Sequence, residues 1–470
     1  MRRICIYILL IVFLLSSTCS ACGYSINGAT SSSEKDFPSF KKEIGFSSDE
    51  FNWKYDFKTT EENIVKYADA IQAGNIYVDS SITEPYQCSI NEINWDIVFT
   101  DSPGTFSLYL LALNPISYLT QAYYITEEPS YLVTAKNILE QWMAYKDTAK
   151  SKNNPYLWYD HGTAIRSNNI IYFLFAYIEQ PQEDIDLSFC DAIMELLEEH
   201  GSHLSNPEEY FENHNHGIFQ DQALIYLSFF FGNQEWLSLA KERLEAQEEY
   251  AFSDEMVHVE NSPGYQIGVI ELFYQIAEFL TSQNDSFGND LYNDVSLSLE
   301  FMSWITKPNG FLAEVGDTNS QKETLTKKDY SVLKYNNNHL SYAATLGERG
   351  EQPDKLSAYY PHSGYYFGRS SWEASGYTDA TWTMFKAGYL SRTHKHADDL
   401  SFMLYSKGYD ILVDPGWYNY MSGNKYRDYF VSSHAHNTII VDEKSYSPTV
   451  ENSSKTGFFS SSSKIGRAHV

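Results

Sequence analysis

Apolar side chains recur at helical spacing from about Phe51 to Ala344, and this repeat constrains the fold more than any other feature of the chain. Residues three or four positions apart share one face of a helix. The stretches with this spacing are Leu132, Ala135, Ile138, Leu139, Trp142 and Met143; Phe189, Ile193, Leu196 and Leu197; Ile267, Ile270, Tyr274 and Ala277; and Val295, Leu299 and Met302, the last ending at Lys307–Gly310. Such helices in series predict stacked hairpins that close, fully or partly, into a toroid. The lack of a clean repeat argues against a regular solenoid.

Beyond about Tyr360 the pattern changes to short segments rich in aromatic and β-branched residues. These segments are 364–369, 381–385, 400–405, 411–413 and 438–441. Segments of this kind, bounded by turn residues, are typical of strands. We therefore expect a helical domain over 46–350 and an antiparallel β domain over 351–463, so that the fold class is multidomain α+β.

The N-terminal residues have the three parts of a signal peptide. A charged start at Met1–Arg3 precedes an apolar run, Ile4–Leu15, that is too short to span a membrane, and small residues follow. We expect a signal peptide over 1–22, then a Ser-rich tether over 23–45. Cys19 or Cys22 could carry a lipid, but neither has the usual Leu three positions upstream. The protein is therefore expected to leave a bacterial cell and to be secreted, periplasmic or a cell-surface lipoprotein.

The C-terminal residues 464–470 resemble a translated sequencing adapter and follow a serine run, Ser460–Ser463. We expect that the natural chain continues and that the β domain is incomplete here. Only Cys88 and Cys190 lie beyond the N-terminal segment, so the chain could form one disulfide but is no disulfide scaffold.

The charge of the chain limits its partners. A formal net charge of −29 argues against nucleic acids and anionic membranes, leaving a lipid anchor as the one expected membrane contact. It does not exclude an anionic polysaccharide or oligosaccharide, because a cleft can carry local Arg and His. The 38 Tyr and 9 Trp could stack on sugars, although core packing is the commoner use of such rings. The oligomeric state stays open.

Histidines and aspartates gather in the expected β domain. His394 and His396 are two positions apart, so on a strand both would project from one face. Asp410 and Asp414 lie at the two ends of one expected strand, 411–413, and His434 and His436 precede the next, 438–441. Two imidazoles and a carboxylate suit a divalent metal, most plausibly zinc. The alternative is a set of surface histidines.

Three further clusters lie in the helical region. Glu212–Gly217 crowds amide and imidazole donors before a helix expected from about Asp221, where they could bind an anion or only cap the helix. Glu260–Gln266 puts Tyr265 at a loop–helix junction, facing a cleft or the core. Tyr156–Gly162 with Arg166 offers rings and a cation for a sugar acid, although Arg166 could instead pair with Asp160.

The ordered set of motifs resembles the heparinase II/III-like polysaccharide lyases, a group that includes related oligoalginate lyases. The motifs are Asn215-His216-Gly217, Glu260-x-Ser-Pro-x-Tyr265, Val315-Gly316-Asp317, His394-x-His396-Ala-Asp398-x-Leu-Ser-Phe and Ala435-His436-Asn437-Thr. The likeness covers residues 156–441.

This resemblance implies an α/α toroid followed by an antiparallel β-sandwich, with the cleft between them. It also implies β-elimination of a uronic-acid glycoside. Removal of the C5 proton requires that the adjacent carboxylate be neutralised, which neutral amide and imidazole donors can do. A phenol or imidazole then takes the proton, and a phenol protonates the leaving oxygen.

The resemblance also assigns roles to particular residues. Asn215 would neutralise the carboxylate, His216 would neutralise it or act as base for one epimer, and Tyr265 would be base and acid. His394 would assist neutralisation. If the first motif is aligned differently, Asn213 and His214 would take the roles given to Asn215 and His216. Among the β-domain tyrosines 418, 420, 426 and 429, we choose Tyr429 as the second catalytic phenol. The residues expected to bind substrate are Trp158, Tyr159, His161, Arg166 and His214.

By the same resemblance, His396, Asp414 and His436 bind a structural zinc ion that braces the β domain. Other functions stay open: a glycoside hydrolase using two of Asp160, Glu260 and Asp317, a non-catalytic glycan-binding lipoprotein, or a metal-dependent hydrolase. The sequence does not select the uronate polymer or decide between endo and exo action.

Overall fold

The computed structural model describes residues 44–51, 59–79, 82–100, 102–319, 337–388, 390–420 and 423–446, and also residues 37, 40, 42 and 335. The expected signal peptide with Cys19 and Cys22, most of the expected tether, and residues 464–470 lie outside the described residues. Cys88 and Cys190 are both free, so the two do not form a disulfide. None of the described helices has the length and apolar character needed to cross a bilayer.

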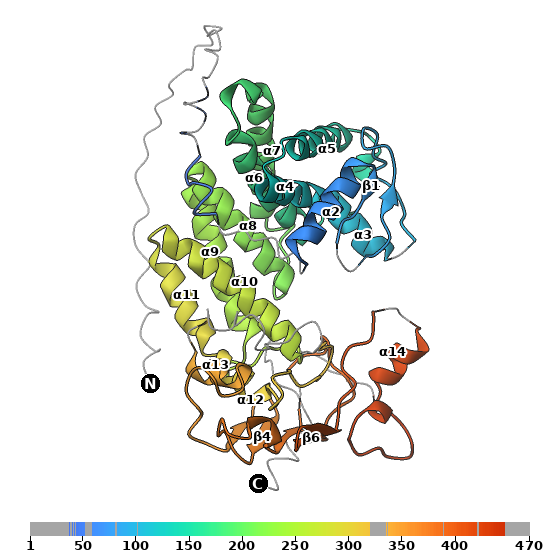
Figure 1. The fold of residues 1–470 in the computed structure, drawn as a ribbon, viewed down its shortest axis with the longest axis vertical. Coiled ribbons are helices and arrows are strands. Elements are labelled where there is room, and N and C mark those ends of the chain that lie inside the picture. The colour runs from blue at the N-terminus through green and yellow to red at the C-terminus, as the bar shows by residue number, and fades with distance from the viewer. Residues whose placement is uncertain are drawn as a thin grey trace, which may run out of the picture.

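The first part of the chain is a series of helical hairpins (Figure 1). After α2 (Glu61–Gln72) and the small β1 (Asn75–Ile76) and β2 (Tyr86–Gln87) pair come α3 (Pro103–Leu111), α4 (Asn114–Thr126), α5 (Ser130–Lys146), α6 (Asp160–Ile178), α7 (Leu187–Ser205), α8 (Asn215–Phe231), α9 (Gln234–Ala251), α10 (Pro263–Ser282), α11 (Ser286–Ser296), α12 (Leu299–Ile305) and α13 (Asn338–Ala344).

The hairpins form two layers. Helices α4, α6, α8 and α10 pack side by side in that order, and each contacts the helix that follows it, α5, α7, α9 or α11. From Gly162 to Ile178, every residue of α6 except Tyr172 is buried, as expected for a central helix that neighbouring helices cover on all sides. In contrast, α9 buries one stripe and exposes its acidic face. This arrangement confirms the predicted helical hairpins.

Two helix boundaries differ from the prediction. The stripe of Val295, Leu299 and Met302 is not one helix, because α11 ends at Ser296 and α12 begins at Leu299. Helix α8 begins at Asn215, not near Asp221. His214 caps it, since its Nδ1 accepts a hydrogen bond from the backbone N–H of His216 at 3.2 Å.

The β domain contains an antiparallel meander in the order β3 (Ser357–Tyr360), β4 (Tyr365–Arg369), β5 (Trp382–Lys386), β6 (Ser401–Ser406) and β7 (Tyr409–Leu412). Its register aligns Phe367, Met384 and Met403 on one buried face. That face packs on α12, where Trp382 Nε1 donates to the carbonyl of Trp304 at 2.9 Å. The described residues of this domain form one sheet, to which the predicted segments 364–369, 381–385, 400–405 and 411–413 contribute.

Two strand predictions are wrong. His394 and His396 lie in the loop before β6, and His394 has a left-handed backbone with φ 53°. Residues 438–441 do not form a strand either, since only Val441 makes an isolated bridge, to Lys444. The left-handed turn at His394 breaks the two-residue alternation, so its side chain and that of His396 need not share a face.

The two domains meet at the loop before α10. Asn261 Nδ2 donates to the carbonyls of Ser391 at 2.8 Å and Thr393 at 3.1 Å. A Cβ added to Gly316 would lie 2.6 Å from the carbonyl oxygen of His394 and 2.7 Å from that of Asn261. Gly316 also has φ 57°, so glycine is required where these three segments converge. This junction holds His394 beside the start of α10.

Candidate active site

Two tyrosines and a histidine meet at the start of α10. Tyr265, in the first turn of this helix, shares a hydrogen bond of 2.7 Å with the hydroxyl of Tyr420, which lies in the loop after β7. The His394 ring stacks on that of Tyr265 with centroids 3.6 Å apart and 20° between the planes. We call Tyr265, Tyr420 and His394 the tyrosine group.

Asp317 contacts the tyrosine group through His394. His394 Nδ1 and His396 Nε2 each lie 2.9 Å from a different oxygen of Asp317, and Arg427 Nη2 donates to it at 2.9 Å. The Asp317 side chain is 1% exposed. Burial raises the pKa of Asp317, but the hydrogen bonds from His394, His396 and Arg427 outweigh burial and hold it well below its ordinary value.

Glu260 approaches His394 from the other side. Its Oε2 lies 3.6 Å from His394 Nε2 and 3.6 Å from His258 Nε2. Burial raises the pKa of Glu260, but the imidazoles, His258 first, outweigh it and lower the pKa. His394 is therefore held between two carboxylates, one near each ring nitrogen.

A second group gathers around Asp160, the first residue of α6. His161 Nδ1 lies 2.5 Å from Asp160 Oδ1, and His216 Nδ1 lies 3.2 Å from Asp160 Oδ2. The His161 and His216 ring centroids are 3.8 Å apart, and those of His214 and His216 are 4.2 Å apart. We call Asp160, His161, His214 and His216 the histidine group. Tyr159 borders it, with its ring centroid 5.5 Å from that of His161.

The charge states in this group follow from its contacts. Burial raises the pKa of Asp160, but the bonds from His161 and His216 outweigh it and lower the pKa. Burial lowers the pKa of His161, and Asp160 offsets only part of that effect. Asp160 is therefore ionised and His161 neutral near pH 7.

Glu260, which lies beside His394, also acts on His214 of the histidine group. Burial and then the neighbouring His216 lower the pKa of His214, while the Glu260 carboxylate acts against them. Burial raises the pKa of Tyr109 on α3 to about 12, with smaller contributions from Asp79 and Tyr265. No pattern in the sequence pointed to Tyr109.

Asn215 is half-buried in the first turn of α8, next to His216. Its side-chain oxygen is buried and lacks a hydrogen-bond partner among the described residues. The N–H groups of a first helical turn have no partner within their helix, and their dipole favours an anion. Asn215 therefore lies where amide donors can meet a carboxylate.

The structure places Tyr420, and not the chosen Tyr429, against Tyr265. Tyr429 on α14 (Lys425–Phe430) is 52% exposed, and its hydroxyl donates to the carbonyl of His434 at 3.2 Å. Tyr420 contacts Tyr265 instead. The tyrosines of this loop could not be distinguished from the sequence, because the path of the loop decides which of them reaches α10.

The structure also contradicts the expected role of Arg166. This residue has no exposed surface and lies over the rings of Trp142 and Trp158, at 4.4 and 4.9 Å. Its Nε donates to His200 at 2.8 Å and its Nη1 to the carbonyl of Leu111 at 3.0 Å, and it does not pair with Asp160. Burial lowers the pKa of Arg166 to about 9. The ring of Trp158 also stacks on the ring of His203, with centroids 3.8 Å apart. Trp158 therefore packs against both Arg166 and His203.

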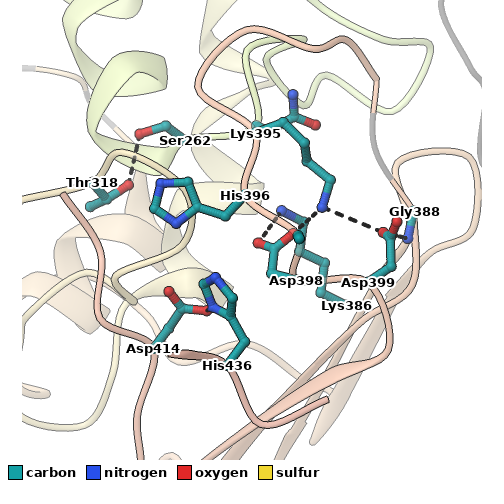
Figure 2. Close-up of polar contacts among 12 residues, drawn as sticks. Ser262, Thr318, Lys386, Gly388, Lys395, His396, Asp398, Asp399, Asp414 and His436 are labelled. Carbon is teal, nitrogen blue, oxygen red and sulfur yellow. Dashed lines mark hydrogen bonds and ion pairs between the residues drawn. The ribbon is translucent and has the colours of Figure 1, made fainter. Parts of the chain in front are cut away.

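The predicted metal ligands come together. His396, Asp414 and His436 are all buried and could each supply one ligand atom, these atoms lying within 4.8 Å of one another. His436 Nδ1 lies 2.8 Å from Asp414 Oδ2. Figure 2 shows the three side chains gathered beside the buried ion pairs that Lys386 and Lys395 make with Asp398.

Comparisons with known proteins agree with this architecture. The family profile "Heparinase II/III N-terminus" matches residues 30–342, and "Heparinase II/III-like, C-terminal" matches residues 352–464. The chain belongs to the heparinase II/III family.

Individual relatives are distant. A "Heparin-sulfate lyase" of Bacteroides stercoris is 24% identical over 248 residues, covering 50% of this chain and 36% of the relative. Another, of Pedobacter heparinus, is 25% identical over 260 residues, covering 50% and 37%. The chain thus spans little more than a third of the length of these two relatives. The structure "Crystal Structure of Heparinase III" aligns with TM-score 0.72 at 18% identity, covering 87% of this chain and 66% of that one, which supports the fold.

Proposed function

We propose that this protein is a polysaccharide lyase that cleaves uronic-acid glycans by β-elimination. The observation that carries the proposal is the pair of phenol oxygens 2.7 Å apart on Tyr265 and Tyr420, with the His394 ring stacked on Tyr265. The family supports the same reaction. The names of the relatives make heparin-like glycosaminoglycans the first substrates to test.

Asn215 and His216 would hold the uronate carboxylate at the start of α8. Hydrogen bonds to this carboxylate delocalise the charge that develops when C5 loses its proton. The helix N-terminus adds a favourable potential for the anion. His394, stacked on Tyr265, would complete the carboxylate site from the β domain.

Tyr265 would act as the base, and a hydrogen bond from Tyr420 would favour its deprotonated form. Burial and then the hydrogen bond with Tyr265 raise the pKa of Tyr420, so in this proposal Tyr420 keeps its proton and would donate it in the bond to Tyr265. Such a bond favours the deprotonated form of Tyr265. The C5–H bond then breaks, its electrons form the C4–C5 double bond, and the C4–O bond breaks. The leaving oxygen takes a proton from a phenol, Tyr265 or Tyr420.

We further propose that His396, Asp414 and His436 hold a structural zinc ion. Among the described residues, His396 Nδ1 and His436 Nε2 are buried without a hydrogen-bond partner, which fits nitrogen ligands for a metal. The second ring nitrogen of His396, Nε2, lies 2.9 Å from Asp317, which can accept its hydrogen bond. Carboxylates commonly hold metal-binding histidines in this way. When bound, the ion would link three loop segments of the β domain. Export from a bacterial cell remains part of the proposal and rests on residues 1–22.

The test is digestion of heparan sulfate, heparin, alginate and hyaluronan, followed by near-ultraviolet absorbance. A lyase creates a conjugated double bond, so absorbance should rise with at least one polymer. New reducing ends without absorbance would instead indicate a glycoside hydrolase. The candidate acids for hydrolysis are already engaged by histidines: Asp160, Glu260 and Asp317.

A further inference from the structure

The histidine group contains a second set of metal ligands, separate from the one in the β domain. Asp160, His161 and His216 each offer one ligand atom, and these atoms lie within 4.8 Å of one another. Two of the three side chains come from α6 and the third from the start of α8, so packing of two helices brings them together. We propose that these three residues bind one exchangeable divalent transition-metal ion at the edge of the active site.

The contacts already present resemble those around a metal. Both imidazoles turn Nδ1 toward Asp160, at 2.5 Å for His161 and 3.2 Å for His216, one to each carboxylate oxygen. The ring centroids of His161 and His216 are only 3.8 Å apart. An ion between the three side chains would need small shifts, because metal–nitrogen and metal–oxygen bonds of about 2.0–2.2 Å place neighbouring ligand atoms only a few ångströms apart.

The donor set selects the class of metal. Two imidazole nitrogens and one carboxylate oxygen suit zinc, cobalt, nickel or copper. Calcium and magnesium prefer oxygen ligands and are not expected here. The side chains of His161, Asp160 and His216 keep 12%, 11% and 23% of their surface exposed, so water can complete the coordination and the ion can exchange.

This exposure distinguishes the site from the one in the β domain. There the side chains of His396, His436 and Asp414 are 0%, 0% and 2% exposed. A buried ion should resist chelators, whereas an ion on the histidine group should be removed by brief dialysis against EDTA.

Occupancy should block the lyase reaction, an inference that rests on the proposed function. An ion bound through Nδ1 of His216 would shift this ring from its place beside Asp160, and with it the Nε2–H that would donate to the uronate carboxylate. Excess zinc should therefore inhibit, competitively with polysaccharide, and EDTA should restore activity.

The experiment measures bound metal without any polysaccharide, so it stands even if the proposed reaction fails. Untagged protein is dialysed against Co²⁺ or Zn²⁺ and analysed for metal per chain, with the visible spectrum of Co²⁺ as a report of imidazole ligands. We expect two ions per chain for the wild type. Asp160→Asn and His161→Gln should each lose the exchangeable ion, and Asp414→Asn should lose the other.

The matched control is Glu209→Gln. Glu209 pairs with His203 at 3.0 Å, but this pair offers only two ligands, so the variant should still bind two ions. Circular dichroism checks folding, and if Asp160→Asn fails to fold, His161→Gln decides. The site would be overturned if the wild type never binds an exchangeable ion. It would also be overturned if Asp160→Asn and His161→Gln both retain that ion. Unchanged activity with the exchangeable ion bound would overturn the blocking consequence.

Discussion

The hydroxyls of Tyr265 and Tyr420 lie 2.7 Å apart although 155 positions separate them in the chain. Tyr265 belongs to the helical domain and Tyr420 to a loop of the β domain. A reaction that uses both phenols therefore depends on the docking of the two domains, which Asn261 and Gly316 secure.

Removing either hydroxyl should abolish turnover with little loss of stability. We expect Tyr265→Phe and Tyr420→Phe to lower kcat by about 100-fold or more, because each removes a proton-transfer group. Tyr429→Phe should retain activity, since Tyr429 lies away from Tyr265. The measurement is absorbance kinetics with thermal unfolding of each variant. Loss of activity in Tyr429→Phe alone would restore that residue as the catalytic phenol.

Asp317→Asn should affect both stability and catalysis. The carboxylate accepts from His394, His396 and Arg427, and loss of a buried charged partner costs about 3–5 kcal/mol. Denaturant unfolding measures this cost, and zinc content and kcat should fall together. Asp399→Asn is the comparison, because Asp399 lies near Lys395 but does not contact His394 or His396. Equal effects in the two variants would contradict a specific role for Asp317.

Loss of the metal in the β domain should lower the unfolding temperature. Asp414→Asn removes one of three ligands, so the tightly held zinc should be absent and added zinc should not restore stability. His434→Gln changes an exposed histidine two positions from His436 and should keep its zinc. Elemental analysis with calorimetry tests this, and an equally stable, zinc-loaded Asp414→Asn protein would refute the site.

Arg166 should contribute to stability and not to substrate binding. Lys in its place cannot reach both His200 and the Leu111 carbonyl, so Arg166→Lys should lower the free energy of unfolding by about 2 kcal/mol or more. Arg166→Met, which buries no charge, should cost less. The KM should stay unchanged in both. A large rise in KM in a stable variant would bring the substrate-binding role back.

Stability should fall as pH rises toward 7 partly because of Glu248 on α9. Burial, and then Asp294, Glu245 and Glu249, raise the pKa of Glu248 to about 7 from 4.5. The folded protein therefore holds this proton more tightly than the unfolded chain, so ionisation between about pH 4.5 and 7 destabilises the fold. Glu248→Gln should unfold at a higher temperature than wild type at pH 8 and at a similar one at pH 4. The exposed Glu242→Gln, on the same helix, should not show this difference.

The sequence by itself determined the helix-to-strand change, most element positions and the residue types of the site. Apolar periodicity is local, so it reports which face of Ser130–Lys146 or Pro263–Ser282 is buried. The candidates Asn215, His216, Tyr265, His394 and His396 were named from motifs; Tyr265, His394 and His396 lie at the domain junction, and Asn215 and His216 lie in the first turn of α8.

Only the tertiary structure decided which of these side chains meet. The path of one loop brings Tyr420, and not Tyr429, to Tyr265, and the buried Arg166 lies over the rings of Trp142 and Trp158. The left-handed turn at His394 directs one imidazole to Tyr265 while Asp317 accepts from both His394 and His396. Such contacts join segments far apart in the chain, and their free energy depends on burial and docking geometry, neither of which has a local pattern in the sequence.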